Sequence, residues 1–596
     1  MANAKTADVF TIQFNSFDKP LVSNSLKVVN LSATGIQSCS NTTDLLEQAL
    51  ANLDNVSIPP DASEQITANV ARYRQLLGGA DPMLLWMVED EELLAKIENG
   101  VHAVSQLLSS EHALVSIACA SRLNEADSQD QLVQWINLLQ QKIVDGSHDT
   151  LDLLQRQWLL VELPLTMAYV LDSTLNTSAV IDLAVDLLKT LVDETLDTDG
   201  WPSNDIMTDF GLLCASLYRS LRLIDSLKEP SGEDSQGQTI SGLPRQLMRL
   251  LRGDGTLMLN STAKELPDEM LSAMLRLSTD LTDQLILERT GKRPVKPRPN
   301  RVALDRSLNS VSEWGGNFLF HDGWERNSCK IAAMYDESGF SIEVGKKKSL
   351  ILGESFPEVS FSGKPLAIEG EPELLVSLCD EQIAFAEVQW TMTGGVKLQR
   401  HVILSLEDRF AWIGDVILPP EDAQTGGAGG KFDYRCRWPL ASGISTIAES
   451  ETTEGYLYDG KKIRALVIPP ALNEWKTERP SGALGAGKLE LEDASFTLAQ
   501  SGTGRALYAP LFLDLSPRRS KRPRTWRQLT VAEKLETVHA DVAVAYRVQV
   551  GKKQFVFYRA LGDAENRTFF GQNVNTELFL GRLEKDRSMT ELLQVE

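Results

Sequence analysis

Residues 542–559, with the sequence VAVAYRVQVGKKQFVFYR, decide the fold of this 596-residue chain. Apolar side chains alternate with small or polar ones at Val542, Val544, Tyr546, Val548 and Val550. This period of two is typical of a half-buried strand. Gly551 and two lysines then form a turn, and a second run carries Phe555 and Phe557. The stretch therefore predicts a β-hairpin in an antiparallel sheet.

The same period of two extends over much of residues 302–596. Examples are GFSIEVGKKKSLILGE (339–354), GGVKLQRHVILSLEDRFAWIGDVIL (394–418) and KLELEDASFTLAQSG (488–502). Turn residues of the types Gly, Asp, Asn and Pro separate these runs. Many short strands that follow one another without helices predict antiparallel sheets stacked as a sandwich.

Residues 43–289 carry a helical period instead. Apolar side chains recur at helical spacing in segments such as TLDLLQRQWLLVELPLTMAYVL (150–171) and FGLLCASLYRSLRLIDSL (210–227). Short breakers such as DTDGWPSND (197–205) stand between them. Long helices joined by short loops pack as antiparallel neighbours, which favours an incomplete α/α toroid over the alternative of an irregular helical domain.

The domain organisation follows from these two periods. The predicted fold class is α+β, with an N-terminal incomplete α/α toroid followed by a C-terminal antiparallel β-sandwich. Residues 1–42 are expected to form an arm with short strands, residues 43–289 the toroid and residues 302–596 the sandwich. The segment TGKRPVKPRPNR (290–301) is basic and rich in proline, so it is expected to be the linker.

The formal net charge of −23 is concentrated in the helical half. Residues 1–290 hold 41 acidic and 19 basic side chains, whereas residues 291–596 hold 41 and 40. An acidic half of this kind repels nucleic acid and anionic membranes at long range, so neither is an expected partner. The basic run PRRSKRPRTWR (517–527) is interpreted as a solvated loop or an ion-pair partner of the helical half, with nucleic-acid binding as the alternative.

The cysteines and the N-terminus favour a reducing, cytoplasmic location. The six cysteines form no CxxC pair, so they are expected to be buried free thiols. The first residues, MANAKTADVFTIQFNS, lack the pattern of a signal peptide. No apolar run approaches the roughly 18–20 residues that a membrane span needs.

Motifs for common cofactors are absent from the sequence. It contains no GxxxxGK[ST], HExxH or GxSxG pattern, and its six histidines show no metal-ligand spacing. We therefore expect neither a metal nor another cofactor.

Several segments resemble the heparinase II/III-like and alginate lyase-like polysaccharide lyases. The loops DTDGWP (197–202) and GDGTLML (253–259) resemble Asp-Gly loops between toroid helices of that family. The run VKLQRHVILSLEDRFAWIGDVI (396–417) resembles a strand pair of its sandwich, and WRQLTV…AYRVQVG…FYRAL…NRTFFGQN resembles its closing segment. The resemblance covers roughly residues 45–590 and implies a toroid followed by a sandwich.

The resemblance also implies a chemistry, namely β-elimination of a glycan that contains uronic acid. In such enzymes a polar group neutralises the substrate carboxylate, and a Tyr or His moves the proton on C5. By position, Tyr335 is the candidate acid or base, His321 its partner, and Asn204 and Arg400 the groups that neutralise the carboxylate. The candidates for binding the sugar chain are Trp201, Asp199 and Asp254.

Two positions depart from the family pattern. The loop DGWPSNDIMTDF (199–210) lacks the family's Tyr, and NSCKIAAMYDESGFSIEVG (327–345) lacks its His. The alternative is therefore a non-catalytic relative that binds a carbohydrate or a protein. A glycoside hydrolase is a third reading, because Asp199 and Asp254 are a loop pair of carboxylates. The expected partner in the main reading is a polysaccharide or oligosaccharide.

Overall fold

The computed structural model describes residues 10–13, 28–31, 72, 152–171, 178–227, 238–260, 265–266, 268–275, 277–278, 283, 286, 309–325, 327–420, 429–476 and 486–596. It divides into a helical unit, Met1–Leu251 with Gly255–Pro299, and a sandwich unit, Arg252–Asp254 with Asn300–Glu596. The helices expected before residue 150, most of the expected arm and the expected linker lie outside the described residues. No helix in the described ranges is both long and apolar enough to span a bilayer.

The described part of the helical unit consists mainly of helices. They are α8 (Leu153–Arg156), the π-helical turn η2 (Gln157–Glu162), α9 (Leu163–Leu171), α10 (Ser178–Thr195), α11 (Asn204–Met207), α12 (Phe210–Leu227), α13 (Gln238–Leu250) and α14 (Asp268–Met274). One antiparallel strand pair accompanies them, β1 (Phe10–Gln13) with β2 (Val28–Leu31). The helices expected at 150–171 and 210–227 are confirmed within the described residues, whereas α11 begins inside the expected breaker DTDGWPSND (197–205).

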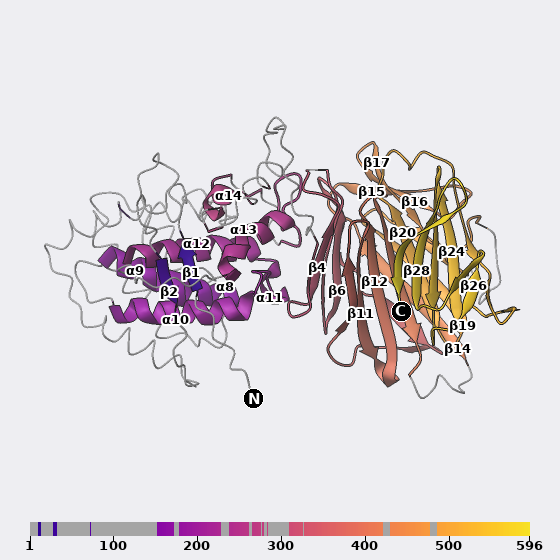
Figure 1. Ribbon diagram of the computed structural model, residues 1–596, viewed down its shortest axis with the longest axis horizontal. Helices are drawn as coiled ribbons and strands as arrows, with labels where there is room; N and C mark the ends of the chain where they lie inside the picture. Colours follow the sequence, from indigo (N-terminus) through magenta and orange to yellow (C-terminus); the bar gives the residue numbers. More distant parts are fainter. Residues whose placement is uncertain are drawn as a thin grey trace. The chain divides into compact units, whose positions relative to one another are not determined.

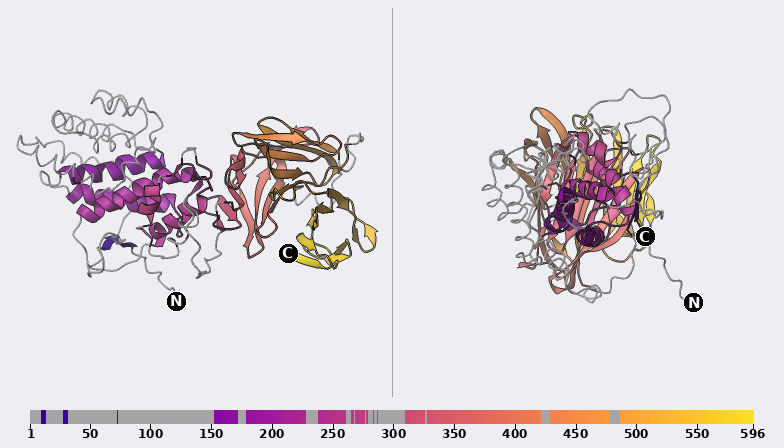
Figure 2. Two further views of the ribbon diagram at one scale, coloured as in Figure 1. Left: turned by 90° about the horizontal axis from the view of Figure 1, so that it is seen from above. Right: turned by 90° about the vertical axis from the view of Figure 1, so that its left-hand side faces the viewer.

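Helix α12 is central to the described part of this unit. It contacts α9, α10 and η2, and Figures 1 and 2 show the long helices, in purple and magenta, running side by side. Its side chains are buried on nearly every face between Phe210 and Ile224, as expected for a helix that other helices surround.

A buried ion pair joins α12 to η2. Both side chains, Arg219 and Glu162, are fully buried, and the Arg219 guanidinium donates through Nε and Nη2 to the two Glu162 oxygens. Ser216 donates to the same carboxylate. Because burial removes both charges from water, loss of either side chain would leave the other charge buried without a counter-charge and would destabilise the unit.

The described part of the sandwich unit forms five antiparallel sheets. The first sheet runs β3 (Ser310–Ser312), β4 (Asn317–His321), β5 (Lys330–Asp336), β6 (Gly339–Gly345) and β7 (Ser349–Glu354). The second runs β18 (Gly487–Leu491), β19 (Ser495–Gly504), β14 (Gly430–Pro439), β8 (Glu358–Phe361) and β9 (Lys364–Pro365).

The remaining three sheets follow. The central sheet has eight strands in the order β10 (Glu373–Cys379), β11 (Ile383–Met392), β12 (Val396–Ser405), β13 (Phe410–Leu418), β20 (Leu507–Asp514), β17 (Lys462–Ile468), β16 (Gly455–Asp459) and β15 (Ile444–Ala448). A short 3-10 turn, η3 (Thr393–Gly395), joins β11 to β12. The C-terminal sheet runs β21 (Arg524–Leu529), β24 (Ala543–Val550), β25 (Lys553–Ala560), β28 (Leu578–Leu583) and β29 (Met589–Val595), and the small sheet runs β23 (Glu536–Thr537), β22 (Val531–Glu533), β26 (Arg567–Phe569) and β27 (Gln572–Val574).

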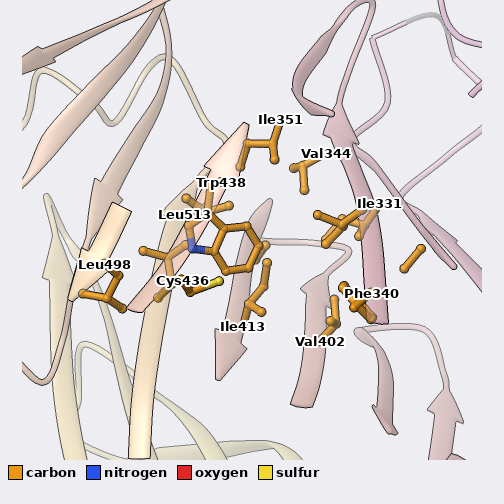
Figure 3. Close-up of a cluster of buried hydrophobic side chains, with 14 of the residues drawn as sticks. Ile331, Phe340, Val344, Ile351, Val402, Ile413, Cys436, Trp438, Leu498 and Leu513 are labelled. Carbon is orange, nitrogen blue, oxygen red and sulfur yellow. The ribbon is translucent and has the colours of Figure 1, made fainter. Parts of the chain in front are cut away.

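Hydrophobic cores hold these sheets in layers. The first core lies between one face of the central sheet and the first and second sheets. Figure 3 shows this core, with Ile331 and Phe340 of the first sheet, Ile413 of the central sheet and Trp438 of the second sheet. The other face of the central sheet packs on the C-terminal sheet, whose outer face packs in part on the small sheet.

The predicted hairpin is confirmed. Strands β24 and β25 pair from Val550 opposite Lys553 to Ala543 opposite Ala560. Gly551 in the turn has a φ of 63°, which glycine adopts without the cost that other residues incur. One expectation for the cysteines is wrong, because Cys379 is exposed, whereas Cys214, Cys329 and Cys436 are buried free thiols. Cys39 and Cys119 lie outside the described residues.

Candidate functional site

The loop before α11 and the first residue of that helix hold three of the expected site residues. Asp197 Oδ1 accepts the backbone N–H groups of Asp199 and Trp201, both at 2.9 Å, which fixes the Asp-Gly stretch as a turn. Asp199 is exposed and Asn204 is half-buried, but Trp201 is only 1% exposed. The indole ring therefore belongs to the core of the helical unit and offers no open face for stacking on a sugar.

The fourth loop residue, Asp254, does not belong to the same unit. It lies in the segment Arg252–Asp254, which groups with the sandwich, whereas Asp199 groups with the helices. Asp254 is half-buried. Asp199 and Asp254, the pair of carboxylates considered for a glycoside hydrolase, thus belong to different units.

Arg400 is part of the sandwich core. Its Nε and Nη2 bind the two oxygens of Asp415 at 2.7 and 2.6 Å, and its Nη1 donates to the Ser355 carbonyl at 2.7 Å. The guanidinium carbon lies 4.8 Å from the Phe340 ring centroid. Burial acts to lower the pKa of Arg400, but Asp415 outweighs it and raises this pKa. Arg400 is 1% exposed, so its charge is committed to Asp415.

Tyr335 also faces the first core. It is 4% exposed, and its ring lies 6.4 Å from that of Phe318. Burial, with a smaller contribution from Glu313, raises the pKa of Tyr335 to about 12. Near neutral pH the phenol is therefore protonated, which disfavours the role of a base.

His321 lies on the opposite face of the first sheet. Strand β4 alternates, so Phe318 and Phe320 enter the first core while His321 points to the other side. His321 is fully buried, its Nδ1 lies 2.9 Å from the Gly323 carbonyl oxygen, and its ring meets that of Trp324 edge to face. The structure therefore does not bring His321 and Tyr335 together.

The face that carries His321 holds a cluster of buried charges, which we call the Lys330 cluster: Lys330, Glu343 and Arg252. Lys330 pairs with His321 across the β4–β5 ladder. Glu343 Oε1 accepts from Arg252 Nε at 2.5 Å and from Ser349 Oγ at 2.6 Å, and its Oε2 accepts from Arg252 Nη2 at 2.8 Å. Lys330 and Glu343 are 4% and 0% exposed.

The environment of Lys330 changes its protonation. Burial lowers the pKa of Lys330 to about 7, against the opposing influence of Glu343 and Asp322, and Arg252 lowers it further. A lysine near this pKa is partly uncharged at neutral pH and is then able to accept a proton. Sequence reasoning missed the Lys330 cluster, although a charged residue inside the apolar strand CKIAAMY was a signal for it.

A second buried polar network lies between the central and C-terminal sheets. His401 Nε2 lies 3.0 Å from the Tyr508 hydroxyl, which accepts from Trp412 Nε1 at 2.9 Å. Arg559 Nη2 donates to Glu387 at 2.7 Å and to Gln399 at 2.8 Å. Burial, with the charges of Arg559 and Arg400, holds the pKa of His401 well below its usual range. These groups lie inside the core between the central and C-terminal sheets and join the two layers.

The described residues contain no group of three or more His, Cys, Asp or Glu side chains that could hold a metal ion. Within the described residues of the sandwich unit, the Lys330 cluster with His321, on the polar face of the first sheet, is the candidate site.

Comparisons with known proteins identify the fold. No family model matches the chain, and no curated protein sequence matches it. The solved structure described as "Crystal Structure of Heparinase III" is 10% identical, with a TM-score of 0.52 over 87% of this chain and 82% of that one. A second, "Heparinase III-BT4657 gene product, Methylated Lysines", is 12% identical, with a TM-score of 0.50 over 87% and 80%.

The chain has the fold of the heparinase III structures. The predicted class, α+β with an incomplete α/α toroid followed by an antiparallel β-sandwich, is confirmed. At 10–12% identity the likeness concerns the fold alone.

Proposed function

We propose that this protein is a non-catalytic relative of the polysaccharide lyases that binds a glycan containing uronic acid. The fold supports a polysaccharide ligand by analogy with heparinase III. The observation that supports the loss of catalysis is the position of Tyr335 and Arg400, which the family resemblance makes the proton-transfer and neutralising groups. Tyr335 lies in the first core and is 4% exposed, and Arg400 packs against Phe340 of that core and is 1% exposed.

β-Elimination requires a base and a cation that both contact the substrate, and the positions of Tyr335 and Arg400 do not allow this. A base must come within about 3 Å of the C5 proton, and a cation must contact the carboxylate of the same sugar. Arg400 would have to leave Asp415, and breaking a buried pair costs about 3–5 kcal/mol. Tyr335 would have to lose a proton that its raised pKa of about 12 retains.

The experiment measures binding and turnover on the same polymers. The full chain is incubated with heparin, alginate, chondroitin sulfate and polygalacturonate, and the ultraviolet absorbance of unsaturated uronate is followed while binding is measured by calorimetry. We expect heat of binding to at least one polymer and no rise in absorbance. A steady rise would contradict the loss of catalysis, and silence in both readouts would contradict glycan binding.

A further inference from the structure

The outer face of the C-terminal sheet carries two arginines, Arg527 and Arg547, that no acidic side chain of the described residues neutralises. We infer that this face binds the carboxylate or sulfate groups of an anionic polysaccharide. We call it the basic face, and it consists of Thr525, Arg527, Arg547, Gln549 and Gln554. The inference rests on the proposed function and assigns it a binding surface outside the Lys330 cluster.

Strand register places the two arginines side by side. Arg527 on β21 lies directly opposite Arg547 on β24, and Thr525 lies opposite Gln549. Gln549 in turn lies opposite Gln554 on β25. Side chains directly opposite one another in an antiparallel pair have Cβ atoms roughly 5 Å apart, and like charges at such positions destabilise the sheet. Burial and the charge of Arg527 lower the pKa of Arg547. A bound anion would relieve this repulsion.

The neighbouring amides hold Arg547 in a fixed orientation. Its Nε and Nη2 donate to Gln554 Oε1 at 3.0 and 2.7 Å, and Nη2 also donates to Gln549 Oε1 at 2.8 Å. Gln549 donates to the Gly551 carbonyl at 3.1 Å. Because the oxygens of both amides already accept from Arg547, the guanidinium needs no further anchoring before a ligand arrives. Such preorganisation reduces the entropy lost on binding.

Arg527 differs from the other arginines around it. It is exposed, and its side chain makes no hydrogen bond or ion pair within the described residues. Its neighbour Arg524, by contrast, binds Glu454 and Glu449, both at 2.6 Å. Arg582 on β28 binds Glu407 and Asp408, both at 2.8 Å. Within the described residues, acids therefore neutralise Arg524 and Arg582 and leave the basic face positively charged.

Further cations and an aromatic ring border this face. The backbone N–H of Gly551 donates to the Pro523 carbonyl at 2.7 Å, so the turn with exposed Lys552 lies beside exposed Arg522. At the free edge of β21, Glu474 accepts from Thr525 Oγ1 at 2.6 Å. The next residue, Trp475, is 56% exposed. An exposed indole beside hydrogen-bond donors offers an amphipathic surface on which a sugar ring is able to stack.

The chemistry of this face suits an acidic glycan better than a nucleic acid. Guanidinium groups bind planar anions with two parallel hydrogen bonds, which suits carboxylate and sulfate groups along a sugar chain. Amide side chains are able to bond to sugar hydroxyls. Nucleic-acid affinity depends instead on neutralising many phosphates, whereas this face offers only two arginines on its strands.

The test compares two double variants that remove the same charge. Arg527→Gln with Arg547→Gln changes the basic face. The control, Arg435→Gln with Arg464→Gln, changes two half-exposed arginines that are already paired with Glu490 and Asp459. Binding of heparin, polygalacturonate and a single-stranded oligonucleotide to the full chain is measured by calorimetry at fixed salt, together with the melting temperature.

We expect the basic-face variant to lose at least about tenfold in affinity for heparin or polygalacturonate, because hydrogen bonds to charged groups contribute that much each. The control should retain the affinity. Both variants should remain folded at the temperature of the titration, because removal of the repulsion offsets the loss of the hydrogen bonds of Arg547, and the melting temperatures check this. Equal affinity of the two variants for the polysaccharide would show that the basic face is not the binding surface, but it would leave the proposed function intact. Binding of the oligonucleotide alone would overturn the glycan as ligand, and no binding by the unaltered chain would overturn both proposals.

Discussion

Replacing Arg400 by methionine tests whether this arginine is structural or binds substrate. The change removes the 2.7 and 2.6 Å contacts to Asp415 and the cation over the Phe340 ring. Asp415 would keep only the Tyr434 hydroxyl, which donates to Oδ2 at 2.6 Å. Because the carboxylate stays buried without its counter-charge, we expect the free energy of unfolding of the sandwich unit to fall by about 3–5 kcal/mol.

The assay is denaturant unfolding followed by tryptophan fluorescence, since Trp390 and Trp438 lie in the same core as the pair. The matched control is the double variant Arg400→Met with Asp415→Asn, which removes the orphaned charge. It should recover part of the loss, and together with Asp415→Asn alone it completes a double-mutant cycle that measures the coupling between the two residues. A loss below about 1 kcal/mol for Arg400→Met, combined with loss of glycan binding, would refute the structural role and make Arg400 a ligand-binding residue.

Three more predictions concern buried groups. Arg219→Leu should destabilise the helical unit by about 3–5 kcal/mol, because the buried Glu162 carboxylate loses its counter-charge. Thermal melts followed by circular dichroism measure this, with Arg156→Leu at a partly exposed pair as the control. A decrease in melting temperature no larger than that of the control would contradict the prediction. His401 has a folded pKa below its unfolded value of about 6.5, so stability should fall as the pH drops below about 6.5, by up to about 1.4 kcal/mol per pH unit. His401→Gln should make unfolding curves between pH 6.5 and 4 less dependent on pH, and an unchanged slope would argue against a neutral His401. Gly414→Ala should cost about 1–3 kcal/mol, because the added Cβ would lie 2.5 Å from the Tyr508 hydroxyl; a variant as stable as the original chain in thermal melts would show that this contact relaxes.

The fold was predictable where burial follows a local period. The helices α10 and α12 and the β24–β25 hairpin each show their periodicity within a single stretch of sequence. Strand β14 showed the same signal, with Phe432, Tyr434, Cys436 and Trp438 buried in alternation, but it was not among the expected strands. Strand β20 gave no such signal, because it is buried on both faces and contains Pro510.

The candidate site was harder to predict, because its partners meet through strand pairing. Arg400 and Asp415 are opposite each other only through the β12–β13 register, so nothing in the sequence showed that the arginine was paired. Arg527 and Arg547 likewise meet only through the pairing of β21 with β24. The separation of His321 from Tyr335 follows from the β4–β5 register and the parity of strand β5, which places Lys330 and Tyr335 on opposite faces.

The most direct test of the account is a single titration of the full chain with heparin and with polygalacturonate, in which heat of binding and ultraviolet absorbance are recorded together. The account predicts saturable binding that depends on Arg527 and Arg547, with no formation of unsaturated uronate. Formation of unsaturated product at a steady rate, unaffected by changes at Arg527 and Arg547, would contradict it.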